Sequence, residues 1–133
     1  MNTNIVIIED SELYAIALKR AIEFQIQVAC TVHFLNPNRE ISPTFEEFHT
    51  EILRAQGDRG IVLLDNCLGK WKWGGANLAP SLRNVISISS DNQRWADHQF
   101  VKKAWVYQGD EVAIAELLEI IRKVSKKMSL DNL

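Results

Sequence analysis

The size, composition and charge of the chain describe one ordinary globular domain. Its 133 residues are 47% hydrophobic and 24% charged, enough for a core without disulfide staples. The formal net charge of −2 gives no general attraction to nucleic acid or anionic membranes, and we expect direct contact with neither. Two cysteines, Cys30 and Cys67, make no disulfide framework, and the apolar runs are too short for a signal peptide or membrane span, so we expect a cytoplasmic protein.

The chain begins with a predicted strand and a predicted helix. The apolar, β-branched run 5–8 is too short for a buried helix and predicts a strand, which stops at two acids, Glu9 and Asp10. Ser11 can cap a helix over 11–24. The apolar residues that recur there at helical spacing are Leu13, Ile16, Ala17, Ala21 and Phe24.

A second strand and a second helix follow. Residues 26–35 are rich in β-branched and aromatic side chains and predict a strand. Ser42 is placed as a helix N-cap with Pro43 at the first helical position, and Gly57 terminates that helix. Its buried stripe is expected to consist of Phe45, Phe48, Ile52 and Leu53.

The middle of the chain centres on the run 60–65, in which four consecutive aliphatic residues lead directly to Asp65. A short run of this kind is typical of a strand covered on both faces, as in parallel sheets. A loop with Trp71 and Trp73 comes next, followed by a short helix over 76–82 that contains Pro80.

The last third predicts two strands and a long helix. We expect strands over 84–90 and 100–106, separated by only nine residues, and a final helix opening at 109–111. We expect one domain over 1–127, with 128–133 as a tail or the start of a linker.

Alternating strands and helices predict a parallel sheet with right-handed crossovers and helices on both faces. Parallel strands end at the same edge, where ligands and chemistry collect in such folds. That edge gathers Glu9, Asp10, Asp65, Ser89 and Lys103. Clustered carboxylates favour a hard divalent cation, Mg²⁺ above all, while an ammonium and a hydroxyl suit phosphoryl oxygens. The chemistry indicated is phosphoryl transfer onto Asp65.

These residues resemble the receiver domains of two-component response regulators over nearly the whole chain. An acidic pair follows the first strand, here Glu9 and Asp10, and a phosphoacceptor closes the third, here Asp65 in Val-Leu-Leu-Asp. A hydroxyl residue before a small one closes the fourth, here Ser89, and a lysine lies on the fifth three residues after an aromatic, here Lys103 after Phe100. The resemblance implies a flavodoxin-like (βα)5 fold with a five-stranded parallel sheet of order 2-1-3-4-5.

The resemblance also implies roles for these residues. Asp10, Asp65 and the backbone carbonyl of Cys67 would bind Mg²⁺, with Glu9 acting directly or through water. Ser89 and Lys103 would grip the phosphoryl group, and Phe100 would be the aromatic that changes rotamer on activation. The chain would serve in a phosphorelay, receiving phosphate from a histidine kinase or phosphotransfer protein and signalling to a downstream protein or a missing output domain. It would not be a conventional enzyme, since it catalyses only its own phosphorylation and dephosphorylation.

The sequence also departs from the family pattern. Leu68 and Gly69 replace the usual Met-Pro, Ala104 replaces the proline after the lysine, and residues 91–99 are too few for a full fourth helix. These departures motivate an alternative function, a phosphorylation-independent protein-interaction module.

Several residue-level alternatives stay open at this point. Glu9 could be a helix-start acid, and one register slip would exchange Lys103 with Lys102. Cys67 is expected to be a small half-buried residue rather than a redox thiol. The sequence leaves a homodimer open.

Overall fold

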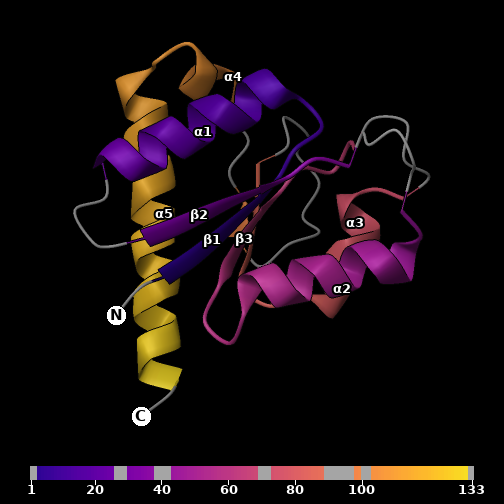
Figure 1. Ribbon diagram of the computed structural model, residues 1–133. Helices are drawn as coiled ribbons and strands as arrows, with labels where there is room; N and C mark the ends of the chain where they lie inside the picture. The colour runs from indigo at the N-terminus through magenta and orange to yellow at the C-terminus, as the bar shows by residue number, and fades with distance from the viewer. Residues whose placement is uncertain are drawn as a thin grey trace.

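A computed structural model describes residues 3–25, 30–37, 43–68, 73–88, 98–99 and 103–131. The chain is an α/β fold whose strands are all parallel (Figure 1). In chain order the elements are β1 (Thr3–Ile8), α1 (Glu12–Gln25), β2 (Cys30–Leu35), α2 (Phe45–Gln56), β3 (Ile61–Leu64), α3 (Gly75–Leu78), a 3-10 turn (Ala79–Ser81), β4 (Val85–Ser87), β5 (His98–Gln99), α4 (Lys103–Tyr107) and α5 (Glu111–Asp131).

Four strands in the order β2-β1-β3-β4 form the body of the sheet. β1 lies between β2 and β3, with Ile8 opposite both Leu35 and Leu64, so these three strands end in step. At the other edge His98 and Gln99 add a two-residue parallel pairing with β4.

The strand predicted over 100–106 is wrong, because residues 103–107 form the helix α4. Residues 100–102 lie outside the described part of the chain. Val106 is buried against the core while its neighbours Trp105 and Tyr107 remain largely exposed. In this segment one residue per helical turn faces the core, whereas a strand would direct every second residue inward.

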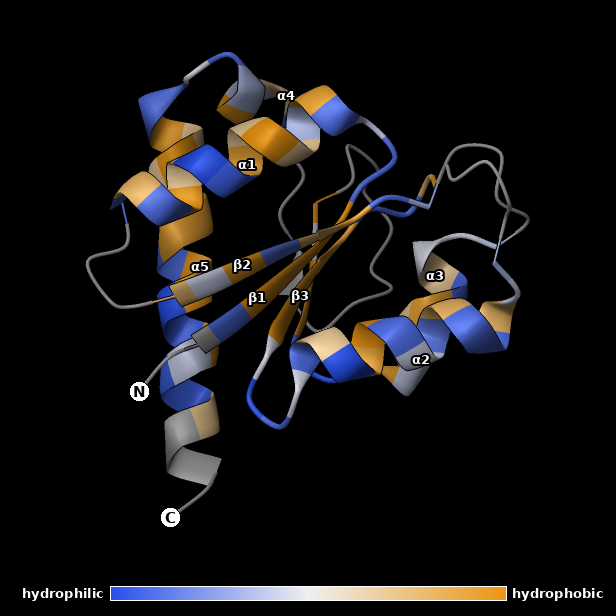
Figure 2. Cartoon of the chain, in the orientation of Figure 1, coloured by the Kyte–Doolittle hydropathy of each residue, from blue (hydrophilic) through white to orange (hydrophobic). Residues whose placement is uncertain are grey.

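Helices cover both faces of the sheet. Figure 1 shows α1 and α5 on one side and α2 and α3 on the other. Ile7 and Leu63 face α1, α4 and α5, whereas Ile8 and Leu64 face α2 and α3. Residues 5–8 of β1 and 61–64 of β3 are fully buried and form continuous hydrophobic runs, which are coloured orange in Figure 2.

The helix boundaries refine the sequence predictions. α1 is confirmed, and the Ser11 hydroxyl caps it by accepting a hydrogen bond from the Tyr14 backbone N–H at 3.4 Å. The N-cap of α2 is Thr44 rather than Ser42, since the Thr44 hydroxyl accepts from the Glu47 N–H at 3.2 Å. Gly57 ends α2 as expected, with a φ of 66° that favours glycine.

The buried faces of the first two helices are now defined. In α1 the buried side chains are Ala15, Leu18 and Ile22, whereas Leu13, Ile16 and Phe24 of the apolar series are exposed. In α2, Leu53 is exposed and Gln56 takes the inner position, donating hydrogen bonds to two backbone carbonyls. The residues 128–131 form the last turn of α5, and Met128 packs in the core. Among the described helices, none is both long and apolar enough to cross a membrane.

Candidate functional site

The ends of β1 and β3 place two carboxylates side by side. The backbone N–H of Asp65 donates to the carbonyl of Ile8 at 3.0 Å, which continues the β1–β3 pairing one residue past the strands. Glu9 and Asp65 therefore follow their strands at the same level. Glu9 is fully buried and Asp65 is 1% exposed, so both acids are held out of water. Buried carboxylates require charged or hydrogen-bonding partners.

Lys103 supplies the charged partner from the first residue of α4. Its Nζ lies 2.6 Å from Asp65 Oδ2 and 3.2 and 3.3 Å from the two carboxylate oxygens of Glu9. The lysine side chain is itself only 11% exposed. The structure thus brings Lys103 to the predicted edge, although from a helix instead of the fifth strand. Lys102 lies outside the described residues.

Asp10 completes a group of three carboxylates. Glu9, Asp10 and Asp65 each offer one oxygen, and these oxygens lie within 4.8 Å of one another. The single ammonium of Lys103 stands beside three acidic groups in this small volume. Their hard oxygen donors could hold a divalent cation such as Mg²⁺, which takes carboxylate ligands and keeps bound waters.

Burial changes the titration of Glu9. The pKa of Glu9 is raised to about 9, and the largest cause is the loss of hydration on burial. The hydrogen bond with Asp10 and the negative charge of Asp65 raise this pKa further, whereas the positive charge of Lys103 lowers it. For Lys103, burial lowers the pKa, but the hydrogen bond to Asp65 and the charges of Glu9 and Asp65 outweigh burial, so its pKa is above the usual value. At neutral pH the lysine is charged and Glu9 favours the protonated form.

The loop after β3 contributes a backbone donor to the site. The N–H of Cys67 donates to Asp65 Oδ1 at 3.4 Å, so both oxygens of the Asp65 carboxylate have a hydrogen-bond partner. The Cys67 side chain is exposed, and the expectation that it would be half-buried is wrong. Trp73 in the same loop packs edge-on against Phe45 of α2, with ring centroids 5.7 Å apart.

The expected hydroxyl and aromatic groups, Ser89 and Phe100, lie outside the described residues. On β4 the structure describes another hydroxyl, Ser87, which is fully buried and whose Oγ has no hydrogen-bond partner among the described residues. Sequence reasoning did not single out Ser87, because within an apolar strand a serine gives no signal of its own.

Tyr14 is a second neighbour of the site that the sequence did not reveal. Its ring centroid lies 5.2 Å from Lys103 Nζ, a cation–π distance. The ring also packs edge-to-face on Tyr107 of α4, with centroids 5.3 Å apart. These contacts arise from the packing of α4 on the first turn of α1, so they cannot be predicted from the spacing of residues in the sequence.

Comparison with known proteins adds no relative. No protein-family model matches the chain, and neither the curated proteins nor the solved structures contain a significant match.

Proposed function

We propose that this chain is a receiver-like phosphoacceptor domain that takes a phosphoryl group onto Asp65. The observation that carries the proposal is the buried Asp65–Lys103 pair, 2.6 Å apart, at the carboxyl edge of a parallel sheet beside Glu9 and Asp10. The finer assignment of the fold, a flavodoxin-like receiver with strand order 2-1-3-4-5, belongs to the same proposal. The parallel order β2-β1-β3-β4 and the helices on both faces support it.

The chemistry needs a nucleophile, charge neutralisation and a donor. An oxygen of Asp65 would attack the phosphorus of a phosphohistidine or small acyl phosphate, forming a P–O bond as the P–N or P–O bond to the donor breaks. Lys103 would offset the charge that gathers on the phosphoryl oxygens, because its ammonium already touches Asp65. Attack of water on the same phosphorus would return free Asp65 and inorganic phosphate.

Mg²⁺ held by Glu9, Asp10 and Asp65, with the Cys67 carbonyl as a further candidate ligand, would supply Lewis-acid neutralisation of the phosphoryl charge. The donor would be a histidine kinase, phosphotransfer protein or acyl phosphate. The output would be a contact with a downstream protein.

Phosphorylation is expected to depend on Asp65 and on Mg²⁺. Intact-protein mass after incubation with acetyl phosphate and MgCl₂ should show one phosphate adduct on the wild type and none on Asp65→Asn. Asp58→Asn is the matched control, because Asp58 is an exposed aspartate in the turn before β3. The adduct should not form when EDTA is present, and hydroxylamine, which cleaves acyl phosphates, should remove it once formed.

A second function is favoured by one observation. Lys103 lies on a helix and β5 is only two residues long, so the region that follows β4 departs from the receiver pattern. A phosphorylation-independent interaction module would keep the Asp65–Lys103 bridge as a structural element. Folded wild-type protein that gains no phosphate from acetyl phosphate or from a panel of kinases would favour this module over the phosphoacceptor.

A further inference from the structure

The ring of Tyr14 contacts both ends of the helix α4. Lys103 is the first residue of this helix and Tyr107 is the last. The Lys103 ammonium lies over the Tyr14 ring, 5.2 Å from its centroid, and the Tyr107 ring packs edge-to-face on Tyr14 with centroids 5.3 Å apart. Residues four apart share one face of a helix, so one side chain of α1 meets α4 along that face.

The position of Lys103 is not secured by its own helix or by its carboxylate partners alone. A lysine ammonium is a point charge on a flexible four-carbon stem, and the conformational entropy of that stem opposes any single position. Two acids share the ammonium, with Asp65 at 2.6 Å and Glu9 at 3.2 and 3.3 Å. The backbone of Lys103 belongs to a helix of five residues, which is too short to be stable by itself.

The Tyr14 ring supplies a further contact for the ammonium. Its distance from Lys103 Nζ lies within the range of about 6 Å over which a cation is attracted to the face of an aromatic ring. This attraction strengthens when the cation is removed from water, and the Lys103 side chain is only 11% exposed. The ammonium is therefore bound by carboxylate oxygens and by the face of a ring that Tyr107 holds in place.

We infer that Tyr14 is a positioning residue, whose ring attracts the Lys103 ammonium and keeps it beside Asp65. The ring carries this role rather than the hydroxyl, because both contacts to α4 are ring contacts. Tyr14 acts on the reaction only through Lys103. The inference rests on the proposed function, because the position of Lys103 matters to phosphoryl transfer only if Asp65 is the acceptor.

Loss of the ring is expected to slow phosphorylation. With acetyl phosphate and MgCl₂, Tyr14→Leu should slow the formation of the phosphate adduct about three- to tenfold, whereas Tyr14→Phe should leave the rate unchanged because the ring remains. Leu13→Ala is the matched control on α1, since the Leu13 side chain is 62% exposed. Equal rates in Tyr14→Leu and Tyr14→Phe would overturn the inference.

A fluorinated ring separates electrostatic attraction from packing. Pentafluorophenylalanine in place of Tyr14 fills nearly the same space as phenylalanine, but its electron-poor face repels an ammonium. This variant should fold as Tyr14→Phe does and react as slowly as Tyr14→Leu. If it instead formed the adduct as fast as Tyr14→Phe, the ring would act by packing alone and the inference would be wrong.

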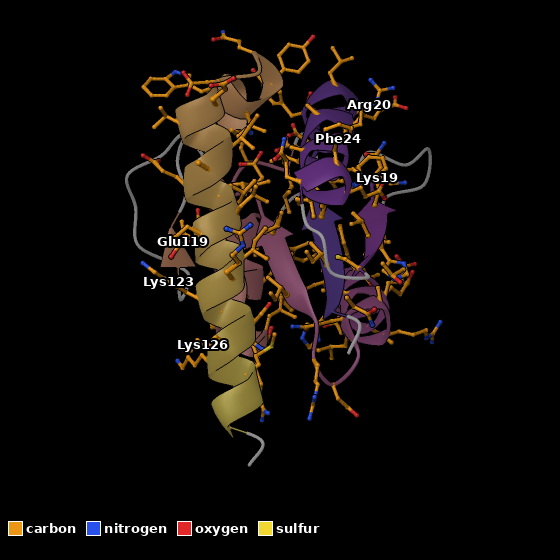
Figure 3. All side chains as sticks on the ribbon, turned by 90° about the vertical axis from the view of Figure 1, so that its left-hand side faces the viewer. Lys19, Arg20, Phe24, Glu119, Lys123 and Lys126 are labelled. Atoms are coloured by element: carbon orange, nitrogen blue, oxygen red, sulfur yellow. The ribbon has the colours of Figure 1, made fainter. Side chains whose placement is uncertain are left out.

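The reactivity of Lys103 tests the inference without phosphate. Pulse acetylation of lysines, read by peptide mass, compares Lys103 with Lys123 and Lys126, two exposed lysines of α5 (Figure 3). Relative to these, Lys103 should become several-fold more reactive in Tyr14→Leu and in the fluorinated variant, and it should be unchanged in Tyr14→Phe. Unchanged reactivity in Tyr14→Leu would overturn the positioning role, whereas absence of any wild-type adduct would count against the proposed function alone.

Discussion

Replacing Lys103 with methionine is expected to lower the free energy of unfolding by about 3–5 kcal/mol at neutral pH. Methionine keeps much of the length of the side chain but leaves Asp65 buried, with its closest cation removed. Urea unfolding followed by circular dichroism measures the loss. Mg²⁺ should restore part of it in the variant, because a divalent cation can replace the missing ammonium among the three carboxylates.

Lys19→Met is the control for this change, since Lys19 is a half-exposed lysine that pairs with Glu23 at 4.0 Å within α1. Its effect should stay below about 0.5 kcal/mol. The raised pKa of Lys103 means that its stabilising charge is present below the ordinary lysine pKa and is lost only at more alkaline pH. A loss under about 1 kcal/mol for Lys103→Met would show that the bridge does not compensate buried charge.

Glu9→Gln is expected to stabilise the protein by about 1–3 kcal/mol at pH 8 and to weaken Mg²⁺ binding at least tenfold. Because the pKa of Glu9 is raised to about 9, the folded state holds a proton that the unfolded state loses near pH 4.5. The free energy of unfolding of the wild type should therefore decrease as the pH rises from 4.5 to about 9. A neutral amide at position 9 avoids this decrease. Calorimetry across this pH range, with and without Mg²⁺, measures both effects.

Glu12→Gln provides the matched control, because Glu12 is an exposed acid three residues further along the chain. It should change neither the pH profile nor Mg²⁺ binding. If Glu9→Gln instead destabilised the protein increasingly as the pH rose, Glu9 would be ionised and its pairing with Lys103 would dominate over burial. Stabilisation together with lost affinity would mark Glu9 as a residue retained for binding at the expense of stability.

The sequence was sufficient to predict β1 and β3 and the two carboxylates that follow them. The runs 5–8 and 61–64 are apolar at every position, which only a strand covered on both faces requires, and parallel pairing then aligns Glu9 with Asp65. The segment after residue 100 was misassigned because its valines and aromatics have strand propensity. In the fold, Lys103 and Val106 are one helical turn apart, so the first reaches the carboxylates and the second reaches the core.

The rest of the site depends on packing that no local pattern encodes. Tyr14 meets Lys103 only because α4 packs on the start of α1, and α1 also carries exposed apolar residues, Leu13, Ile16 and Phe24, opposite its buried ones. Periodicity identified that helix correctly but could not say which of its two apolar stripes is buried. The packing of α1 on the sheet determines which side of the helix is buried, and Leu18 and Ile22 lie on that side.

The helix α4 is only five residues long, far too short to be stable by itself. It is anchored at one end by the ionic contacts of Lys103 and near the other by the buried Val106. One of its two anchors is therefore an electrostatic contact with the carboxylates of the site. Any event that changes the charge on Asp65 changes the free energy that keeps α4 folded, and any ligand that orders α4 changes the affinity of those carboxylates by the same factor.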